Sequence, residues 1–151
     1  MTCSRHVRCA NPAFAAVERA GAVLTHGELC RRAETRALQL MGDGVGAFRP
    51  CPVLVDNSPV DLVELLAVYR ANGVAVPIHR ATPRARVEEL VARLSPDPML
   101  HGASTIVFTS GTTGAPKAAV LSAERQAAKL QMIRRETGWQ DGRRTLLALQ
   151  L

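Results

Sequence analysis

Apolar segments with strand spacing alternate with apolar segments with helix spacing along most of this 151-residue chain. The strand-like runs are short, whereas the helical runs repeat their apolar residues every three or four positions. Such alternation predicts an α/β fold with a largely parallel sheet. We expect strands at 52–55, 74–78, 104–108, 118–121 and 145–149, and helices at 28–41, 59–71, 83–94 and 123–136.

Capping residues mark several of the expected helix starts. Ser58-Pro59 and Thr82-Pro83 each combine a side chain that caps a helix with a proline suited to its first turn, and Ser122 gives a third cap. The helix at 59–71 is apolar nearly all round, which predicts deep burial. On the helices at 28–41 and 123–136 the predicted inward residues are Leu29, Cys30, Ala33, Ala37, Leu38 and Met41, and Ala123, Ala127, Leu130 and Ile133.

Residues 109–117, Thr-Ser-Gly-Thr-Thr-Gly-Ala-Pro-Lys, give the strongest chemical signal in the sequence. Glycines let the backbone approach a ligand closely, and backbone N–H groups in such turns form an anion-binding concavity. Hydroxyl groups add donors, and a lysine adds a charge suited to phosphate. We predict a polyphosphate-binding loop, with donors at Thr109, Ser110, Thr112 and Thr113, turn glycines at Gly111 and Gly114, and a charge partner at Lys117.

The loop does not have the spacing of a Walker A motif, which places four residues between its first glycine and a Gly-Lys-[Ser/Thr] triplet. Here two residues separate Gly111 from Gly114, two more precede Lys117, and a strand pattern follows. The residue order instead resembles the phosphate loop of the adenylate-forming superfamily. That superfamily includes acyl-CoA synthetases, luciferases and the adenylation domains of nonribosomal peptide synthetases.

Three upstream segments, 23–33, 53–58 and 68–78, are similar to signatures of the same superfamily and occur in the same order. The resemblance implies the N-terminal part of the large domain of an adenylate-forming enzyme. We therefore expect 1–151 to be a partial AMP-binding domain, with an irregular N-terminus over about 1–20. Because the chain stops within an apolar run, we also expect a truncated protein that is inactive alone.

The resemblance also implies a reaction. ATP and a small carboxylic acid give an acyl-adenylate and pyrophosphate, with the loop around the β- and γ-phosphates, and the acyl group then forms a thioester with CoA. The sites for Mg²⁺, adenine and ribose are implied to lie beyond Leu151. Two alternatives stay open: an adenylation domain that loads a carrier protein, as in nonribosomal peptide synthetases, and a non-catalytic gene fragment.

Departures from the superfamily pattern bear on the substrate. His79-Arg80 stand where relatives carry Asn or Asp followed by Pro, and Ala123 replaces a common histidine. The spacer between Pro77 and Thr109 is short. This spacer and residues 116–120 resemble o-succinylbenzoate–CoA ligases of menaquinone synthesis, so that acid is one candidate substrate.

Composition argues against several other classes of protein. The net charge is +6, but the arginines are scattered and aromatic residues make up 3%, so we expect no nucleic-acid partner. The four cysteines lack CxxC spacing and the histidines form no cluster with them, which predicts no metal site. No run has the length of a membrane span, and no signal-peptide core is present. We expect a soluble cytoplasmic protein without a membrane partner.

Overall fold

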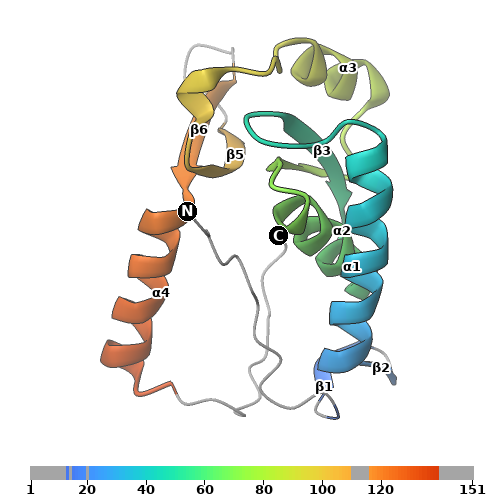
Figure 1. Cartoon of the computed structure of the whole chain (residues 1–151), viewed down its shortest axis with the longest axis vertical. Helices are drawn as coiled ribbons and strands as arrows, with labels where there is room; N and C mark the ends of the chain where they lie inside the picture. Colours follow the sequence, from blue (N-terminus) through green and yellow to red (C-terminus); the bar gives the residue numbers. More distant parts are fainter. Residues whose placement is uncertain (1–12, 14, 20, 110–115, 140–151) are drawn as a thin grey trace.

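The structure is a computed structural model that describes residues 13, 15–19, 21–109 and 116–139. From α1 to β5, helices alternate with strands, as the sequence predicts (Figure 1). The expected strand at 145–149 lies outside the described residues. The elements are β1 (Ala15–Arg19), β2 (Ala22–Thr25), α1 (His26–Gly42), β3 (Pro50–Val55), α2 (Pro59–Arg70), β4 (Val74–His79), α3 (Arg84–Ala92), the 3₁₀ turn η1 (Pro98–Leu100), β5 (Ala103–Thr109), β6 (Lys117–Ser122) and α4 (Ala123–Thr137).

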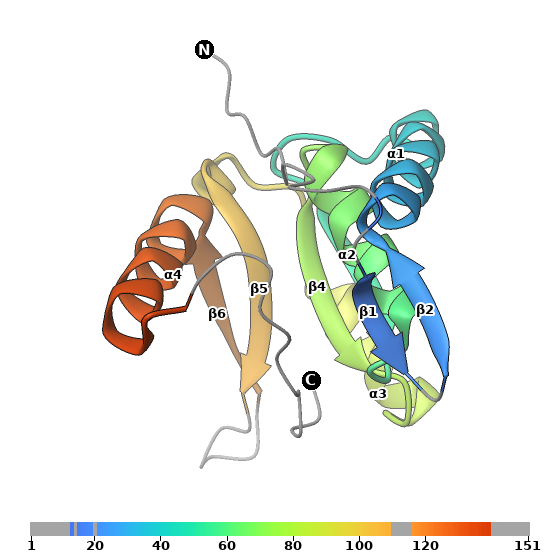
Figure 2. The same ribbon diagram turned by 90° about the horizontal axis from the view of Figure 1, so that it is seen from below.

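A four-stranded sheet in the order β3-β4-β5-β6 forms the centre of the fold. β4 pairs in parallel with both β3 and β5, whereas β5 and β6 pair antiparallel, so the sheet is mixed. β4 and β5 point the same way and β6 returns beside β5 (Figure 2). The last pairing is antiparallel because the short connection between β5 and β6 cannot make the crossover that parallel strands require. Parallel pairing thus accounts for two of the three contacts between strands, in line with the predicted largely parallel sheet.

A two-stranded hairpin precedes α1. β1 pairs antiparallel with β2 through a turn at Gly21, whose φ of +81° is a left-handed conformation that glycine adopts without a side-chain clash. Ala16 and Val17 pack against the cluster of buried residues under α1. The expectation of an irregular N-terminus is therefore wrong for residues 15–19. A strand of five residues depends on its partner strand and on packing against other elements, and the sequence of the strand alone does not show these.

A capping box starts α1. The Thr25 hydroxyl accepts a hydrogen bond from the Glu28 backbone N–H at 3.2 Å, and the Glu28 carboxylate accepts one from the Thr25 backbone N–H at 3.1 Å. The Thr25 backbone N–H and the Thr25 hydroxyl, which also donates to the Glu28 carboxylate at 3.0 Å, lower the pKa of Glu28 below its ordinary value, with Arg32 and Arg31 adding a smaller attraction. The helix therefore begins at His26, two residues before the predicted start.

The buried face of α1 differs from the predicted one. Leu29, Ala33 and Ala37 are buried as expected, together with Leu40. Leu38 and Met41 were expected inward but are 64% and 45% exposed. The buried residues follow one another at intervals of four, four and three positions, which places them on one face of the helix. Leu38 and Met41 lie outside that face.

The Ser58 hydroxyl caps α2 by accepting from the Val60 backbone N–H at 3.2 Å, and Pro59 occupies the first turn, as predicted. Ala67 and Val68 are fully buried between α1 and the sheet, whereas Val60 is 56% exposed. The helix is therefore well buried as predicted, with Val60 as the exposed residue in its first turn. β4 is the most buried strand, since Val74, Ala75 and Val76 lie between packed elements on both faces.

The two later helices depart from their predicted packing. Thr82 was expected to cap α3, but Pro83 is its N-cap residue and no side chain caps the helix. α4 is capped by Ser122 and ends at Gly138 with a φ of +61°, as predicted. No described residue of α4 is buried, and the predicted inward Leu130 is 57% exposed, because the main described neighbours of this helix are the two strands β5 and β6.

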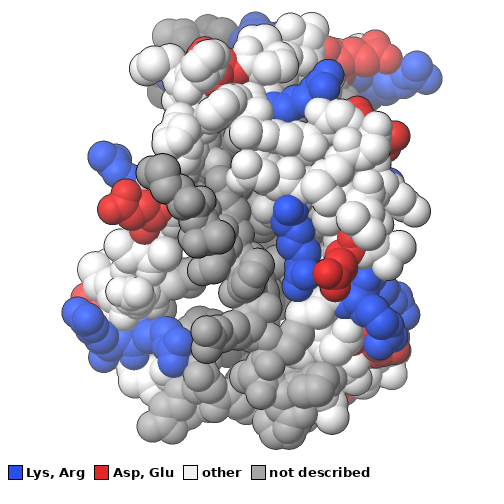
Figure 3. Space-filling model, in the orientation of Figure 1, with Lys and Arg blue, Asp and Glu red and all other residues white. Residues whose placement is uncertain are grey.

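Charged side chains of both signs are interspersed on the face shown in Figure 3. Over α3, for example, Arg84 and Arg86 pair with Glu88 and Glu89. The positive net charge therefore does not gather into one continuous patch on this face. None of the helices in the described ranges is long and apolar enough to cross a membrane.

Candidate functional site

The described ends of the predicted phosphate loop face each other across a hairpin. β5 ends at Thr109 and β6 begins at Lys117, and these two residues are register partners. The Thr109 hydroxyl donates to the Lys117 carbonyl oxygen at 3.3 Å, and both residues are exposed. The structure thus brings the first and last predicted site residues together. Ser110, Gly111, Thr112, Thr113 and Gly114 lie outside the described residues, so their role stays a prediction.

The base of the hairpin is held by buried hydroxyl groups on β5. Ser104 donates to the Leu121 carbonyl oxygen of β6 at 3.2 Å. The Thr105 hydroxyl lies 3.0 Å from the Tyr69 hydroxyl of α2 and accepts from Gln126 of α4 at 3.2 Å. Because Ser104 and Thr105 are only 5% and 6% exposed, these bonds form in a site of low dielectric. They connect the hairpin to helices on either side of it in the sequence.

The loop leaves the sheet at the edge where ligands bind in many α/β proteins. Val55 of β3 pairs in parallel with His79 of β4, and Ala75 pairs in parallel with Thr105 of β5. The carboxyl ends of β3, β4 and β5 therefore point to the same edge, as the arrowheads of β4 and β5 show in Figure 2. In open α/β sheets ligands bind outside this carboxyl edge.

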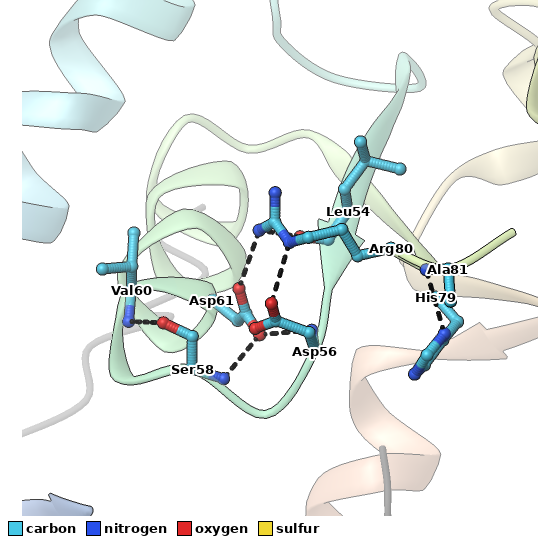
Figure 4. Close-up of polar contacts among 8 residues, drawn as sticks. All are labelled: Leu54, Asp56, Ser58, Val60, Asp61, His79, Arg80 and Ala81. Carbon is cyan, nitrogen blue, oxygen red and sulfur yellow. Dashed lines mark hydrogen bonds and ion pairs between the residues drawn. The ribbon is translucent and has the colours of Figure 1, made fainter. Parts of the chain in front are cut away.

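An ionic cluster lies at the same edge, between β3, α2 and the end of β4 (Figure 4). Asp61 is 1% exposed, and its Oδ2 accepts from the backbone N–H groups of Asp56 and Ser58 at 2.7 and 2.8 Å. Arg80 pairs with Asp56 at 3.0 Å and with Asp61 at 3.4 Å, and also donates to the Leu54 carbonyl oxygen. The cluster ties the turn after β3 to the turn after β4.

The sequence contained a partial signal for this cluster. Asp61 is the third residue of a helix whose cap, Ser58, was recognised, and an acidic residue at that position indicates a capping box. Asn57 and Ser58 end the segment 53–58 that resembles a superfamily signature, and Ser58 was also expected as a helix cap. Asn57 has a φ of +66°, which asparagine tolerates in tight turns. His79-Arg80 was noted only as a departure, and no sequence pattern indicated that Arg80 would reach both acids.

The described side chains of the loop suit phosphate better than a metal ion. Thr109 offers a hydroxyl and Lys117 an ammonium group, whereas Mg²⁺ prefers carboxylate and carbonyl oxygens. Within the described ranges, no three His, Cys, Asp or Glu residues lie close enough together to hold a metal.

No protein-family model matches the chain. In sequence it is similar to the nonribosomal peptide synthetase gloA of Glarea lozoyensis, with 29% identity over 154 aligned positions that cover 74% of this chain and 2% of that protein. In structure it is similar to ATP-bound MatB from Rhodopseudomonas palustris, with a TM-score of 0.73 and 22% identity over 83% of this chain and 35% of that one. It is also similar to the peptide synthetase FmoA3 bound to α-methyl-L-serine-AMP, with a TM-score of 0.70 and 20% identity over 82% and 18% of the two chains.

The fold is the N-terminal part of an adenylate-forming enzyme domain. The expected fold class is thereby confirmed. The chain spans about 2% of the length of gloA and about a third of the MatB chain.

The finer expectations about function are less well supported. The proteins similar in sequence include peptide synthetases such as gloA, whereas MatB, one of the structural neighbours, is a malonyl-CoA synthetase. The cues for an o-succinylbenzoate–CoA ligase receive no support from these comparisons.

Proposed function

We propose that the protein contributes to the ATP-dependent activation of a carboxylic acid, in the manner of the adenylation domain of a nonribosomal peptide synthetase. The carboxylate oxygen would form a bond to the α-phosphorus of ATP as the bond to pyrophosphate breaks. The acyl group of the adenylate would then pass to the thiol of a carrier protein, releasing AMP. This is the alternative that the sequence left open, and the sequence relatives favour it over transfer to CoA.

The observation that carries this proposal is the placement of the two described residues that flank the loop. Thr109 and Lys117 face each other at the carboxyl edge of a sheet whose fold is similar to chains solved with ATP and with an aminoacyl-AMP. A hydroxyl donor and an ammonium group there would meet phosphate oxygens whose negative charge grows as pyrophosphate leaves. Groups placed where charge develops stabilise the transition state more than the ground state.

A CoA ligase is the second candidate, because the similarity to MatB is as strong as that to FmoA3. The two candidates share the first half-reaction and differ in the thiol that accepts the acyl group. The o-succinylbenzoate specificity belongs to this second candidate and rests on the short spacer and on the resemblance of residues 116–120.

The first test is ATP–pyrophosphate exchange by the complete product of the gene, including any residues encoded beyond Leu151, because we expect residues 1–151 to be inactive alone. The panel contains amino acids, aryl acids and dicarboxylic acids, with malonate and o-succinylbenzoate among them. Exchange that depends on one acid supports the proposal. Acid-dependent acylation of an added carrier protein but not of CoA then separates the two candidates. Absence of exchange with every acid, in a protein that is folded by circular dichroism, would contradict adenylation itself.

The second test concerns Lys117. We expect Lys117→Ala to lower the rate of adenylate formation about ten- to a hundredfold, because one charge-assisted contact contributes about 1.5–3 kcal/mol. Thioester formation from a supplied acyl-adenylate should hardly change, since no pyrophosphate is present in that step. Lys129→Ala, which removes an exposed lysine from α4, is the control and should alter neither step. Equal losses in both steps would mean that Lys117 supports the fold and does not bind phosphate.

A further inference from the structure

Arg93 connects the C-terminal end of α3 to the residue before Lys117. Its Nη1 donates to the Pro116 carbonyl oxygen at 3.5 Å, which is longer than the usual range of about 2.7–3.2 Å and marks a weak hydrogen bond. Its Nη2 forms an ion pair with Glu89 of α3 at 3.0 Å. The guanidinium therefore bridges from the helix to the start of β6.

The ion pair directs Arg93 toward the hairpin. Glu89 precedes Arg93 by four positions, a spacing that places both side chains on one face of the helical turn. A planar guanidinium presents several donors in fixed directions, so it can bind the carboxylate and the carbonyl oxygen together. Arg86 also pairs with Glu89, and among the residues that the structure describes this contact within α3 is its one hydrogen bond to a side chain.

The start of β6 has little other packing on this side. A pocket of about 240 Å³ lies between the α3–η1 segment and the β5–β6 hairpin, with Leu94, Ile106 and Val120 among the residues that line it. Val120 is 52% exposed, and Lys117 and Ala118 are also exposed. The ladder with β5 and the Thr109 bond to the Lys117 carbonyl oxygen hold the start of β6 from one side, and the Arg93 contact is the polar contact that reaches it from α3.

We propose that Arg93 is a positioning residue for the phosphate site. By holding the Pro116 carbonyl group, it fixes where β6 begins and therefore where the Lys117 ammonium group stands relative to Thr109. Arg93 acts through the backbone and does not touch the nucleotide. This inference rests on the proposed function for its catalytic consequence, because a small displacement of a group that binds substrate can cost a large part of the rate.

The matched variants are Arg93→Gln, which removes both contacts, and Arg86→Gln, which removes a partner of Glu89 without touching the hairpin. The first measurement is hydrogen–deuterium exchange of peptides that span 116–121. We expect Arg93→Gln to speed exchange there about three- to tenfold, and Arg86→Gln to leave it unchanged. This readout requires no catalytic activity, and equal exchange in the two variants would overturn the proposal.

The second measurement is ATP–pyrophosphate exchange by the same proteins. Arg93→Gln should raise the KM for ATP about three- to tenfold and leave the KM for the acid within about twofold, whereas Arg86→Gln should change neither. A global loss of stability would lower the amount of active enzyme without this selective effect. An unchanged KM for ATP in Arg93→Gln would overturn the positioning role. If the wild-type protein showed no exchange with any acid, the proposed function and the catalytic part of this inference would fail, while the exchange of 116–121 would still decide the structural contact.

Discussion

Asp61 provides the most direct test of what holds the carboxyl edge of the sheet together. Its carboxylate is 1% exposed and accepts from the backbone N–H groups of Asp56 and Ser58 at 2.7 and 2.8 Å. Its other oxygen lies 3.4 Å from the Arg80 guanidinium. A buried charge of this kind is stable only while its hydrogen bonds and its partner are in place.

The size of the effect follows from these contacts. Asp61→Asn has nearly the same shape and can keep its carbonyl oxygen toward the two backbone N–H groups. Each of those bonds then changes from about 1.5–3 kcal/mol, with a charged acceptor, to about 0.5–1.5 kcal/mol with a neutral one. Two such changes, with the lost attraction to Arg80, should lower the free energy of unfolding by about 2–3 kcal/mol. Asp61→Ala leaves both N–H groups without an acceptor and should cost about 3–5 kcal/mol.

Urea unfolding of the purified chain, followed by far-ultraviolet circular dichroism, measures this effect. Glu88→Gln is the control, because the Arg84–Glu88 pair is 92% and 63% exposed and such pairs contribute little. Arg80→Gln should cost less than Asp61→Asn, since Arg80 is half exposed, and the double variant should cost less than the sum of the two. If Asp61→Asn unfolded at the same urea concentration as Glu88→Gln, the argument that the buried carboxylate braces this edge would be refuted.

Two further predictions concern packing and pH. A Cβ atom at Gly73 would lie 2.7 Å from the Val45 Cγ1 atom and 3.1 Å from the Val68 Cγ1 atom, so Gly73→Ala should lower the free energy of unfolding by about 1–3 kcal/mol. Gly46→Ala should not lower the free energy of unfolding, because a Cβ atom at Gly46 has no atom of a non-adjacent residue within 4 Å. Equal urea midpoints for the Gly73 and Gly46 variants would contradict the close approach of Val45 and Val68 to Gly73. Because the pKa of folded Glu28 is below its ordinary 4.5, its contribution to stability is present above that pH and is lost as the pH falls below it. Urea midpoints measured at about pH 7 and at about pH 3 should therefore differ less in Glu28→Gln than in the wild type, and an equal difference would exclude this role.

The sequence predicted the elements better than it predicted their surroundings. Helix caps are local, so Ser58 and Ser122 were identified correctly from their neighbours in the chain. The β1 strand was missed, because a short strand depends on a partner and a packing surface more than on its own residues. The exposure of Leu130 could not be predicted either, since apolar spacing indicates a face but does not say what covers it.

The candidate site shows the same division. Thr109 and Lys117 could be placed on either side of a loop from residue type and order alone, and the ladder between β5 and β6 brings them together. The sequence could not reveal Arg80 and Arg93, which reach this edge from β4 and from α3, because an isolated arginine has no pattern of its own. Both make long-range contacts with acids or carbonyl groups of other elements. This arrangement gives a physical reason for the departure at His79-Arg80. A proline in place of Arg80 would lack the guanidinium that pairs with Asp56 and Asp61. It would also lack the backbone N–H that Arg80 donates to the Val55 carbonyl oxygen at 2.8 Å. Arg80 thus stabilises the carboxyl edge at β3 and β4, and Arg93 contacts it at the start of β6. The Asp61 variants test the contacts of Arg80, and the Arg93 variant tests the contact with Pro116.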